Sequence, residues 1–292
     1  MIKNTSCAVY IATCDRYSDL WPGFFHCWNR YWPDCPFEVY LGANEKSWPG
    51  ADVTTLSSPP DSAWSEQVAR QLETLSYEYV LCILDDFYLR ARVCTSRIMD
   101  LLQYLKAADG AMLRLLPRPP PQIRSRSSPS VGECLPNTPY RICTQAAIWR
   151  RRDLISLLQD KESIWEFEAN GQARADATGK RFFSVYNAAL PYQGMIFHHV
   201  VEKGEWIPSE YWWCRRRGIP CERSKRKLLS FKDFSILLLA EFLNWFLTII
   251  AGGHAHSLRV RIKAVIPQIA LRTYQRMRKY SPVKRPTLPD SH

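Results

Sequence analysis

Paired cysteines are missing from this chain. Its ten cysteines are spread singly, with no CxxC pair and no histidine and cysteine cluster at the spacing of zinc ligands. A structural zinc site is therefore excluded, and we expect reduced, mostly buried thiols of the cytosolic kind. The chain also has no internal repeat. The segment before the first apolar run, residues 1 to 5, is short and polar and leaves no room for a secretory signal peptide. We therefore expect the protein to act on the cytoplasmic side.

Charge is unevenly placed along the 292 residues. Residues 215 to 292 contain 17 of the 39 Lys and Arg but only 4 of the 28 Asp and Glu, so the C-terminal part of the chain is strongly basic. With 46% apolar residues, the chain is not disordered and is long enough for one large domain with its own core. We predict a catalytic domain over residues 1 to 214 and a basic, membrane-associating helical segment over residues 215 to 292.

The chain opens with a strand, a helix and a strand. Residues 7 to 13 form a short apolar strand, Asp15 to Trp32 have the aromatic spacing of a helix, and Phe37 to Asn44 read as a second strand. A strand, helix, strand unit implies a parallel sheet, so we predict an α/β fold. Residues 48 to 62 are rich in Pro and Ser and predict a loop, followed by a helix over Trp64 to Leu75.

Two adjacent acids follow a fully uncharged strand. Tyr79 to Leu84 (YVLCIL) has the pattern of a strand buried on both faces, and Asp85 and Asp86 come directly after it. Ligands of open α/β sheets bind at the carboxyl ends of the strands. Two carboxylates there are hard oxygen ligands for Mg²⁺ or Mn²⁺, which can neutralise a diphosphate. The same pair could instead cap the next turn.

The middle of the chain continues the alternation of helices and strands. We predict a helix over residues 95 to 108, a strand over Gly110 to Pro117, and a Pro, Ser and Arg loop over Arg118 to Pro139. Loops of this length are often functional lids. Tyr140 to Trp149 reads as a strand running into a helix that continues over Asp153 to Gln159.

With these motifs the chain resembles GT-A glycosyltransferases, particularly the bacterial enzymes of O-antigen, capsule and lipopolysaccharide synthesis. The resemblance rests on the order of elements over residues 7 to 214 and on ILDDFYL in the place of a DxD motif, although only two adjacent acids are present. It implies a Rossmann-like, mostly parallel sheet with flanking helices. It also implies donor binding by Asp85, Asp86 and the end of the first strand, whose residues are Thr13, Asp15 and Arg16. These three could equally be a capped helix start.

The resemblance further implies a carboxylate general base, for which SIWEFE offers two candidates. Glu168 is favoured and Glu166 is second, because the family's base sits in an acidic pair near a helix start. On a helix, side chains two apart point in different directions, so one of them at most faces the site. An ordinary solvated acidic turn is the competing interpretation.

Aromatic and amide side chains near these acids are candidates for acceptor binding. Trp149 and Trp165 could stack on the apolar face of a sugar, and Gln145 could hydrogen-bond an acceptor hydroxyl. Most of the 11 Trp must nevertheless lie in the core.

Two histidines follow the apolar run GMIF. In many enzymes of the resembling family a late histidine completes the metal shell, so His198, with Asp85 and Asp86, is a candidate ligand for Mn²⁺ or Mg²⁺. His198 and His199 would point to opposite sides of a strand, so one of the two at most can bind. A histidine simply hydrogen-bonded in place is the alternative.

The C-terminal segment combines an apolar stretch with a basic one. Residues 234 to 251 are apolar, but Glu241, Asn244 and Thr248 form one polar stripe, which favours a helix in the membrane interface over one that spans it. Residues 258 to 285 carry nine Lys and Arg, no acid, and an apolar face, typical of an amphipathic helix on anionic lipid. Pro267 would kink this second helix.

These observations predict a peripheral or monotopic enzyme on the cytoplasmic face of the inner membrane. It would take a nucleotide-sugar donor and a lipid-linked oligosaccharide or lipopolysaccharide acceptor, and it would invert the anomeric centre. No nucleic-acid-binding motif accompanies the basic charges, so no nucleic acid is expected. One rival is a sugar nucleotidylyltransferase, although CDRYSDLWPG after the first strand lacks the glycine-rich basic loop that such enzymes need. Another rival is a non-catalytic adaptor that binds membrane or nucleic acid.

Overall fold

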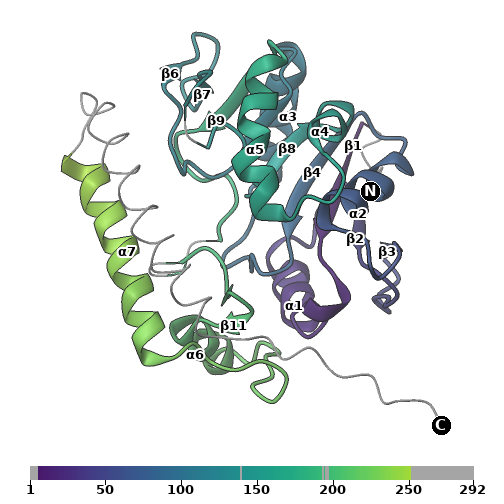
Figure 1. Cartoon of the computed structure of the whole chain (residues 1–292), viewed down its shortest axis with the longest axis vertical. Coiled ribbons are helices and arrows are strands. Elements are labelled where there is room, and N and C mark those ends of the chain that lie inside the picture. Colours follow the sequence, from purple (N-terminus) through teal and green to yellow (C-terminus); the bar gives the residue numbers. More distant parts are fainter. Residues whose placement is uncertain (1–5, 139, 193, 195–196, 251–292) are drawn as a thin grey trace. The chain divides into compact units, whose positions relative to one another are not determined.

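The structure is a computed structural model that describes residues 6–138, 140–192, 194 and 197–250. The chain forms two compact units, Met1–Phe234 and Ser235–His292. The first unit runs past residue 214, where we predicted the end of the catalytic domain, and that functional boundary stays a prediction. The strands and helices that concern the site belong to the first unit. Figure 1 shows these elements along the chain.

A nine-stranded sheet forms the centre of this unit, in the order β3-β2-β1-β4-β8-β5-β9-β7-β6. Its strands are β1 (Cys7–Ala12), β2 (Glu38–Gly42), β3 (Val53–Leu56), β4 (Tyr79–Leu84), β5 (Met112–Arg114), β6 (Ile123–Arg124), β7 (Val131–Cys134), β8 (Ala147–Arg150) and β9 (Phe182–Val185). Strands β7 and β8 run opposite to the others. The predicted α/β fold with a mostly parallel mixed sheet is confirmed.

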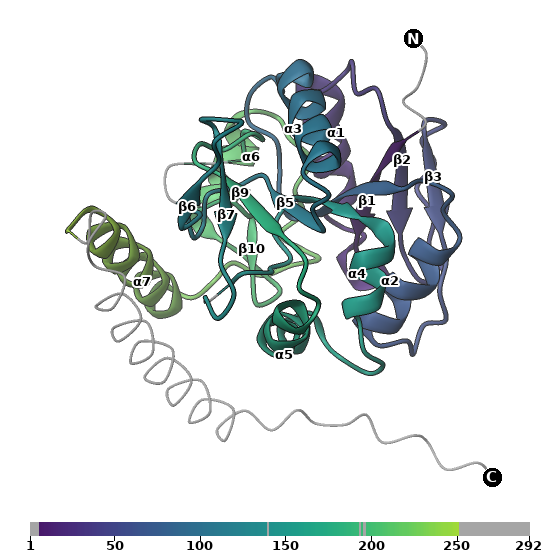
Figure 2. The ribbon, with the colours of Figure 1, turned by 90° about the horizontal axis from the view of Figure 1, so that it is seen from above.

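Helices cover both faces of the sheet. The helices of this unit are α1 (Trp21–Tyr31), α2 (Trp64–Glu73), α3 (Thr95–Ala107), α4 (Arg151–Leu157), α5 (Ile164–Ala177) and α6 (Pro208–Arg216), and a short 3₁₀ helix, η1 (Asp15–Tyr17), precedes α1. A separate hairpin consists of β10 (Val201–Glu202) and β11 (Glu205–Trp206). Seen from above, α1 and α3 lie on one face, and α2, α4 and α5 lie on the other (Figure 2). Each face has its own apolar core, which fixes the central strands in place.

The opening unit is as predicted, with one difference. Strands β1 and β2 are parallel, Ala8 pairing with Glu38, and α1 connects them. The predicted helix from Asp15 is instead η1 followed by α1, which begins at Trp21 with Pro22 in its first turn. Proline lacks a backbone N–H and suits that position. Residues 14 to 20 therefore form a connecting loop above the sheet edge.

Two predicted loops contain strands. Strand β3 lies within residues 48 to 62, and the hairpin of β6 and β7 lies within residues 118 to 139. The loop predictions were wrong at these places because β3 and β6 lie at the two edges of the sheet. An edge strand buries little, so its sequence lacks an apolar run; both residues of β6 are exposed. The predicted strand over residues 140 to 149 is confined to β8.

The last described helix is α7 (Phe231–Ile250), which agrees with the predicted helix over residues 234 to 251. Within the described ranges, no helix combines the length and apolarity that a membrane span requires. The predicted basic helix over residues 258 to 285 lies outside the described residues.

Candidate functional site

The candidate site lies where β1 and β4 end side by side. Ala12 pairs with Leu84, which brings the next residues, Thr13 and Asp85, together. The Thr13 hydroxyl donates a hydrogen bond to Asp85 Oδ2, and Trp21 Nε1 donates to Thr13 Oγ1 over 3.0 Å. Asp85 is buried, so this chain of hydrogen bonds replaces its lost hydration.

Burial raises the pKa of Asp85 well above its ordinary value, and the neighbouring charge of Asp86 raises it further. The hydrogen bonds from Thr13 and Trp21 act in the opposite direction. Asp85 is thus a carboxyl group held by the protein, and its side chain links the ends of β1 and β4.

Asp86 differs from its neighbour. Its Oδ1 atom is buried and has no hydrogen-bond partner among the described residues. Burial raises its pKa to about 6, while the charge of His199 lowers it, so the carboxylate is ionised at neutral pH. A buried carboxylate oxygen without a partner calls for a ligand, either a cation or a polar group of a substrate.

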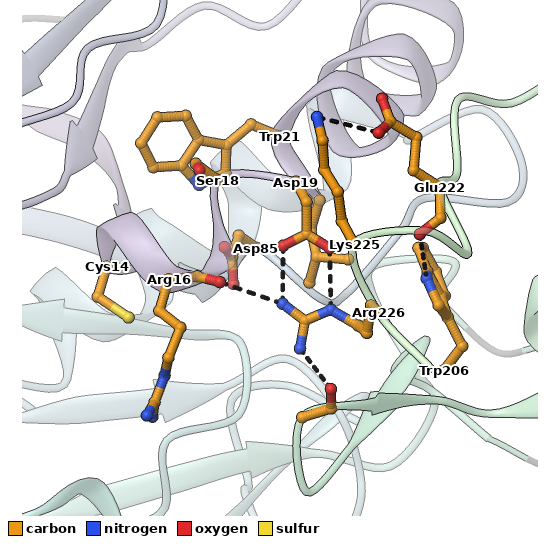
Figure 3. Close-up of polar contacts among 12 residues, drawn as sticks. Cys14, Arg16, Ser18, Asp19, Trp21, Asp85, Trp206, Glu222, Lys225 and Arg226 are labelled. Carbon is orange, nitrogen blue, oxygen red and sulfur yellow. Dashed lines mark hydrogen bonds and ion pairs between the residues drawn. The ribbon is translucent and has the colours of Figure 1, made fainter. Parts of the chain in front are cut away.

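Asp15 and Arg16 have separate roles in the structure. The Asp15 carboxylate accepts hydrogen bonds from the backbone N–H groups of Asn44, Glu45 and Lys46, at 3.0 to 3.2 Å. Asp15 therefore ties the loop after β1 to the loop after β2. The Arg16 side chain is exposed and extends away from Arg226 (Figure 3). Of these two side chains, that of Arg16 is more accessible to a donor.

A third carboxylate reaches the same edge of the sheet. Strand β8 is antiparallel to β4, with Ala147 opposite Cys82, so the residues before β8 lie where β4 ends. Glu168, on α5, accepts hydrogen bonds at Oε1 from the backbone N–H of Thr144 (2.6 Å) and from its hydroxyl (2.7 Å). The structure thus brings Glu168 to the edge that carries the aspartate pair.

Glu166 faces another way. It accepts a hydrogen bond from the Ser163 backbone N–H at 2.8 Å and completes a capping box at the start of α5. The hydrogen bonds from Ser163 lower the pKa of this exposed carboxyl group. The two glutamates of SIWEFE are therefore distinguished by the helix, with Glu166 at its cap and Glu168 toward the sheet edge.

The acceptor candidates are dispersed. Gln145 Nε2 donates to the Arg118 carbonyl over 3.1 Å, and its Oε1 is buried without a partner in the described part of the chain. Trp149 is only 2% exposed and meets the Phe182 ring edge to face, a placement that does not support a role as a sugar platform. Trp165 is 74% exposed on α5. Gln145 is the candidate that this geometry places nearest the strand ends.

The histidines precede β10 rather than lying in a strand, so the predicted alternation does not apply. The Val200 N–H donates to the Asp86 carbonyl, which attaches this segment to the aspartate pair. His199 Nε2 pairs with Glu202 at 3.1 Å. His198 has both ring nitrogens buried without a partner in the described ranges, and burial lowers its pKa to about 4, so the ring is neutral.

Several residues of the site were not predicted. Gln67 Nε2 donates to the Thr13 carbonyl at 2.7 Å, and Gln71 Nε2 donates to the Ala43 carbonyl at 2.8 Å. Both glutamines are buried on α2, four positions apart and beside Val68 and Leu72. Amides on an apolar helix face were a readable signal, because buried polar groups need partners. Asp19 and Arg226 were also missed.

Known proteins match this chain by structure and not by sequence. No family model matches the chain, and no curated protein matches it. Among solved structures it is similar to S. aureus TarS, at 15% identity over 83% of this chain and 44% of that chain, with a TM-score of 0.45. It is also similar to TarS 1-349 in complex with UDP, at 13% identity over 63% of this chain and 58% of that chain, with a TM-score of 0.43. A third similar structure is CMP:2-keto-3-deoxy-manno-octonic acid synthetase complexed with CTP, at 14% identity over 65% of this chain and 92% of that chain, with a TM-score of 0.41. The chain spans less than two thirds of the length of these TarS chains.

Proposed function

We propose that the protein is a GT-A-type glycosyltransferase that moves a sugar from a nucleotide-sugar donor to a saccharide acceptor. The observation that carries this proposal is the unpartnered, buried Oδ1 of Asp86 beside Asp85 at the carboxyl edge of β1 and β4. In α/β sheets this edge is where nucleotide ligands bind. Thr13, Asp15 and Arg16 lie on the loop that would meet the nucleotide.

Glu168 is the proposed general base. Both hydrogen bonds from Thr144 go to Oε1, which leaves Oε2 to accept the proton of an acceptor hydroxyl. Direct attack by that hydroxyl on the anomeric carbon, with the nucleoside diphosphate leaving from the opposite side, inverts the configuration. Gln145, also at this edge, would orient the acceptor.

Asp86 also suits a divalent cation. Mg²⁺ is commonly held by one or two carboxylates together with substrate phosphates and water, and a free carboxylate oxygen meets that need. The described residues contain no group of three or more His, Cys, Asp or Glu that could hold a metal ion, so a donor diphosphate would supply most ligands. A Mg²⁺ or Mn²⁺ bound there, with His198 or His199 nearby, would stabilise negative charge on the leaving diphosphate.

The finer assignment follows the charge distribution of the chain. We propose an O-antigen, capsule or lipopolysaccharide pathway, with a lipid-linked saccharide as acceptor, at the cytoplasmic face of the inner membrane. The supporting features are the apolar sequence of α7 and the basic residues after it, a combination suited to an anionic lipid surface.

A thermal-shift screen of nucleotide sugars tests the function. The full-length protein is heated with UDP-, GDP- and CMP-sugars, with and without Mn²⁺, and stabilising donors are then assayed for nucleotide release. We expect one donor class to raise the melting temperature and to be slowly hydrolysed. No stabilisation and no turnover with any donor would reject a glycosyltransferase. Pyrophosphate release from a nucleoside triphosphate and a sugar phosphate would instead identify a nucleotidylyltransferase.

Replacing the proposed base provides a sharper prediction. Glu168→Gln keeps an oxygen for the Thr144 hydrogen bonds but cannot take a proton, so kcat should fall about 10²- to 10⁴-fold with little change in donor KM. Glu166→Gln is the matched control, because that side chain caps α5, and it should keep near-normal kcat. Equal rates for Glu168→Gln and the wild type would remove Glu168 from the mechanism.

A further inference from the structure

Residues 218 to 229, here called the strap, follow α6 and return to the candidate site. The Trp206 N–H donates to the Lys227 carbonyl (2.8 Å), and the Leu229 N–H donates to the Trp206 carbonyl (2.9 Å), so the end of the strap is bonded to β11. Its beginning lies against α1, where a β-carbon at Gly23 would be 2.5 Å from the Pro220 carbonyl oxygen. The strap is therefore fixed at both ends.

Arg226 projects from the strap into the loop after β1 (Figure 3). Its Nε and Nη2 form a two-pronged ion pair with Asp19, at 3.0 and 2.8 Å, and both side chains are at most 9% exposed. Nη2 also donates to the Arg16 carbonyl (3.3 Å), and Nη1 donates to the Gly204 carbonyl (2.7 Å). One guanidinium thus joins the β1 loop, the turn between β10 and β11, and the strap.

Apart from the hydrogen bonds of Asp15 and Lys46, the loop that Arg226 holds has little regular structure. η1 is three residues long, and its N-terminal Cys14 makes no side-chain capping bond. The Arg226 guanidinium lies over the Tyr17 ring, 4.5 Å from its centre. The same loop connects Thr13, which bonds Asp85, to Trp21, which bonds Thr13. Moving this loop would therefore disturb the aspartate pair.

Arg226 also places a permanent positive charge near the two acids. Its charge lowers the pKa of Asp85 and of Asp86, against the larger effect of burial. Because Asp19 is the carboxylate partner of Arg226, the guanidinium is held in one position and does not form an ion pair with Asp85 or Asp86.

We propose that Arg226 is a positioning residue of the donor site, which orders residues 14 to 20 for a nucleoside diphosphate and provides the fixed positive charge beside Asp85 and Asp86. This inference rests on the proposed function, since it names the ligand class of the same site. Its expected signature is a loss of nucleotide affinity that exceeds the loss of folding stability.

Three variants of the full-length protein separate these effects. Arg226→Met removes both the positive charge and the guanidinium that donates two hydrogen bonds to Asp19, and Arg226→Lys keeps the charge alone. Asp19→Asn removes the carboxylate partner but keeps a hydrogen-bond acceptor. Lys225→Met is the matched control, because Lys225 lies in the same strap with a 59% exposed side chain and pairs only at the surface with Glu222. Hydrogen exchange of residues 14 to 20 and binding of UDP and GDP by calorimetry are measured for each.

Arg226→Met should speed exchange across residues 14 to 20 and raise the Kd of the nucleoside diphosphate that the wild type binds by about 10-fold or more, equivalent to one good charged contact. Arg226→Lys should recover part of the affinity, and Lys225→Met should match the wild type. Unchanged exchange in Arg226→Met, or a lower melting temperature with unchanged Kd, would overturn the inference. If the wild type binds neither nucleotide, the inference about a nucleoside diphosphate is overturned, while the donor screen decides the proposed function and the exchange data decide whether Arg226 orders the loop.

Discussion

Asparagine at position 86 is expected to reduce sugar transfer by about 10²- to 10³-fold while making the unliganded protein more stable. The activity falls because the Asp86 Oδ1 atom, which has no protein partner in the described residues, is the proposed contact for a cation or the donor diphosphate. A neutral amide cannot hold a divalent cation in the same way. Transfer rates with saturating donor measure this effect.

The gain in stability depends on pH in a defined direction. Folding raises the pKa of Asp86 from an ordinary 3.8 to about 6, so between these values the folded state binds more protons than the unfolded state. The contribution of Asp86 to the free energy of unfolding therefore falls as pH rises from about 4 to 6. Above pH 6 the folded protein bears the full destabilisation by the buried, ionised carboxylate. After allowance for partial exposure the cost is about 1 kcal/mol.

Melting in metal-free buffer tests this second effect. Asp86→Asn should melt about 3 °C above the wild type at pH 7.5 and at the same temperature near pH 4. Asp100→Asn, at an exposed site on α3, should show no such difference. A variant that melts lower than the wild type at pH 7.5 would mean that ionised Asp86 stabilises the fold, contrary to its placement.

Methionine at position 114 is expected to destabilise the first unit by about 3 kcal/mol or more. Arg114 lies on β5 and is fully buried. Its guanidinium donates to the carbonyls of Pro119 and Tyr140, both at 2.7 Å, and to the Ser184 hydroxyl at 3.2 Å. It thus holds both ends of the segment that carries β6 and β7. Methionine fills similar space but removes the donor from both carbonyls and from the buried Ser184 hydroxyl.

Equilibrium unfolding in urea measures this loss. Arg152→Met is the matched control, because the Arg152 side chain is 72% exposed on α4 and should cost less than about 0.5 kcal/mol. A free energy of unfolding for Arg114→Met within 1 kcal/mol of that control would show that the carbonyls find other partners.

The sequence was most informative where a segment is buried on both sides. The uncharged run Tyr79 to Leu84 coincides with β4, and the acids after it lie at the sheet edge as predicted. Strands β3 and β6 were missed because they bury little and carry no apolar run. Strand β8 was predicted, but its direction was not. It lies antiparallel between β4 and β5, and the sequence AIWR does not differ from that of a parallel strand.

The site was less predictable than the fold because its contacts join distant segments. The two glutamates of SIWEFE look alike in the sequence, and their hydrogen bonds with Ser163 and Thr144 distinguish them. Arg226 lies in a basic run that the sequence assigned to lipid binding. Its actual partner, Asp19, is 207 positions away, and no periodicity or composition reports such a pair.

That separation also has a consequence for synthesis of the protein on the ribosome. Residues 14 to 20 are among the first to be made, but the guanidinium that fastens them is made 207 residues after Asp19. At about 5–20 residues per second, the interval is roughly 10–40 s. Once Asp85 and Asp86 have also been made, the loop beside them has its Asp15 hydrogen bonds but still lacks the Arg226 contact. Donor binding should therefore begin only late in translation, once most of the first unit has left the exit tunnel.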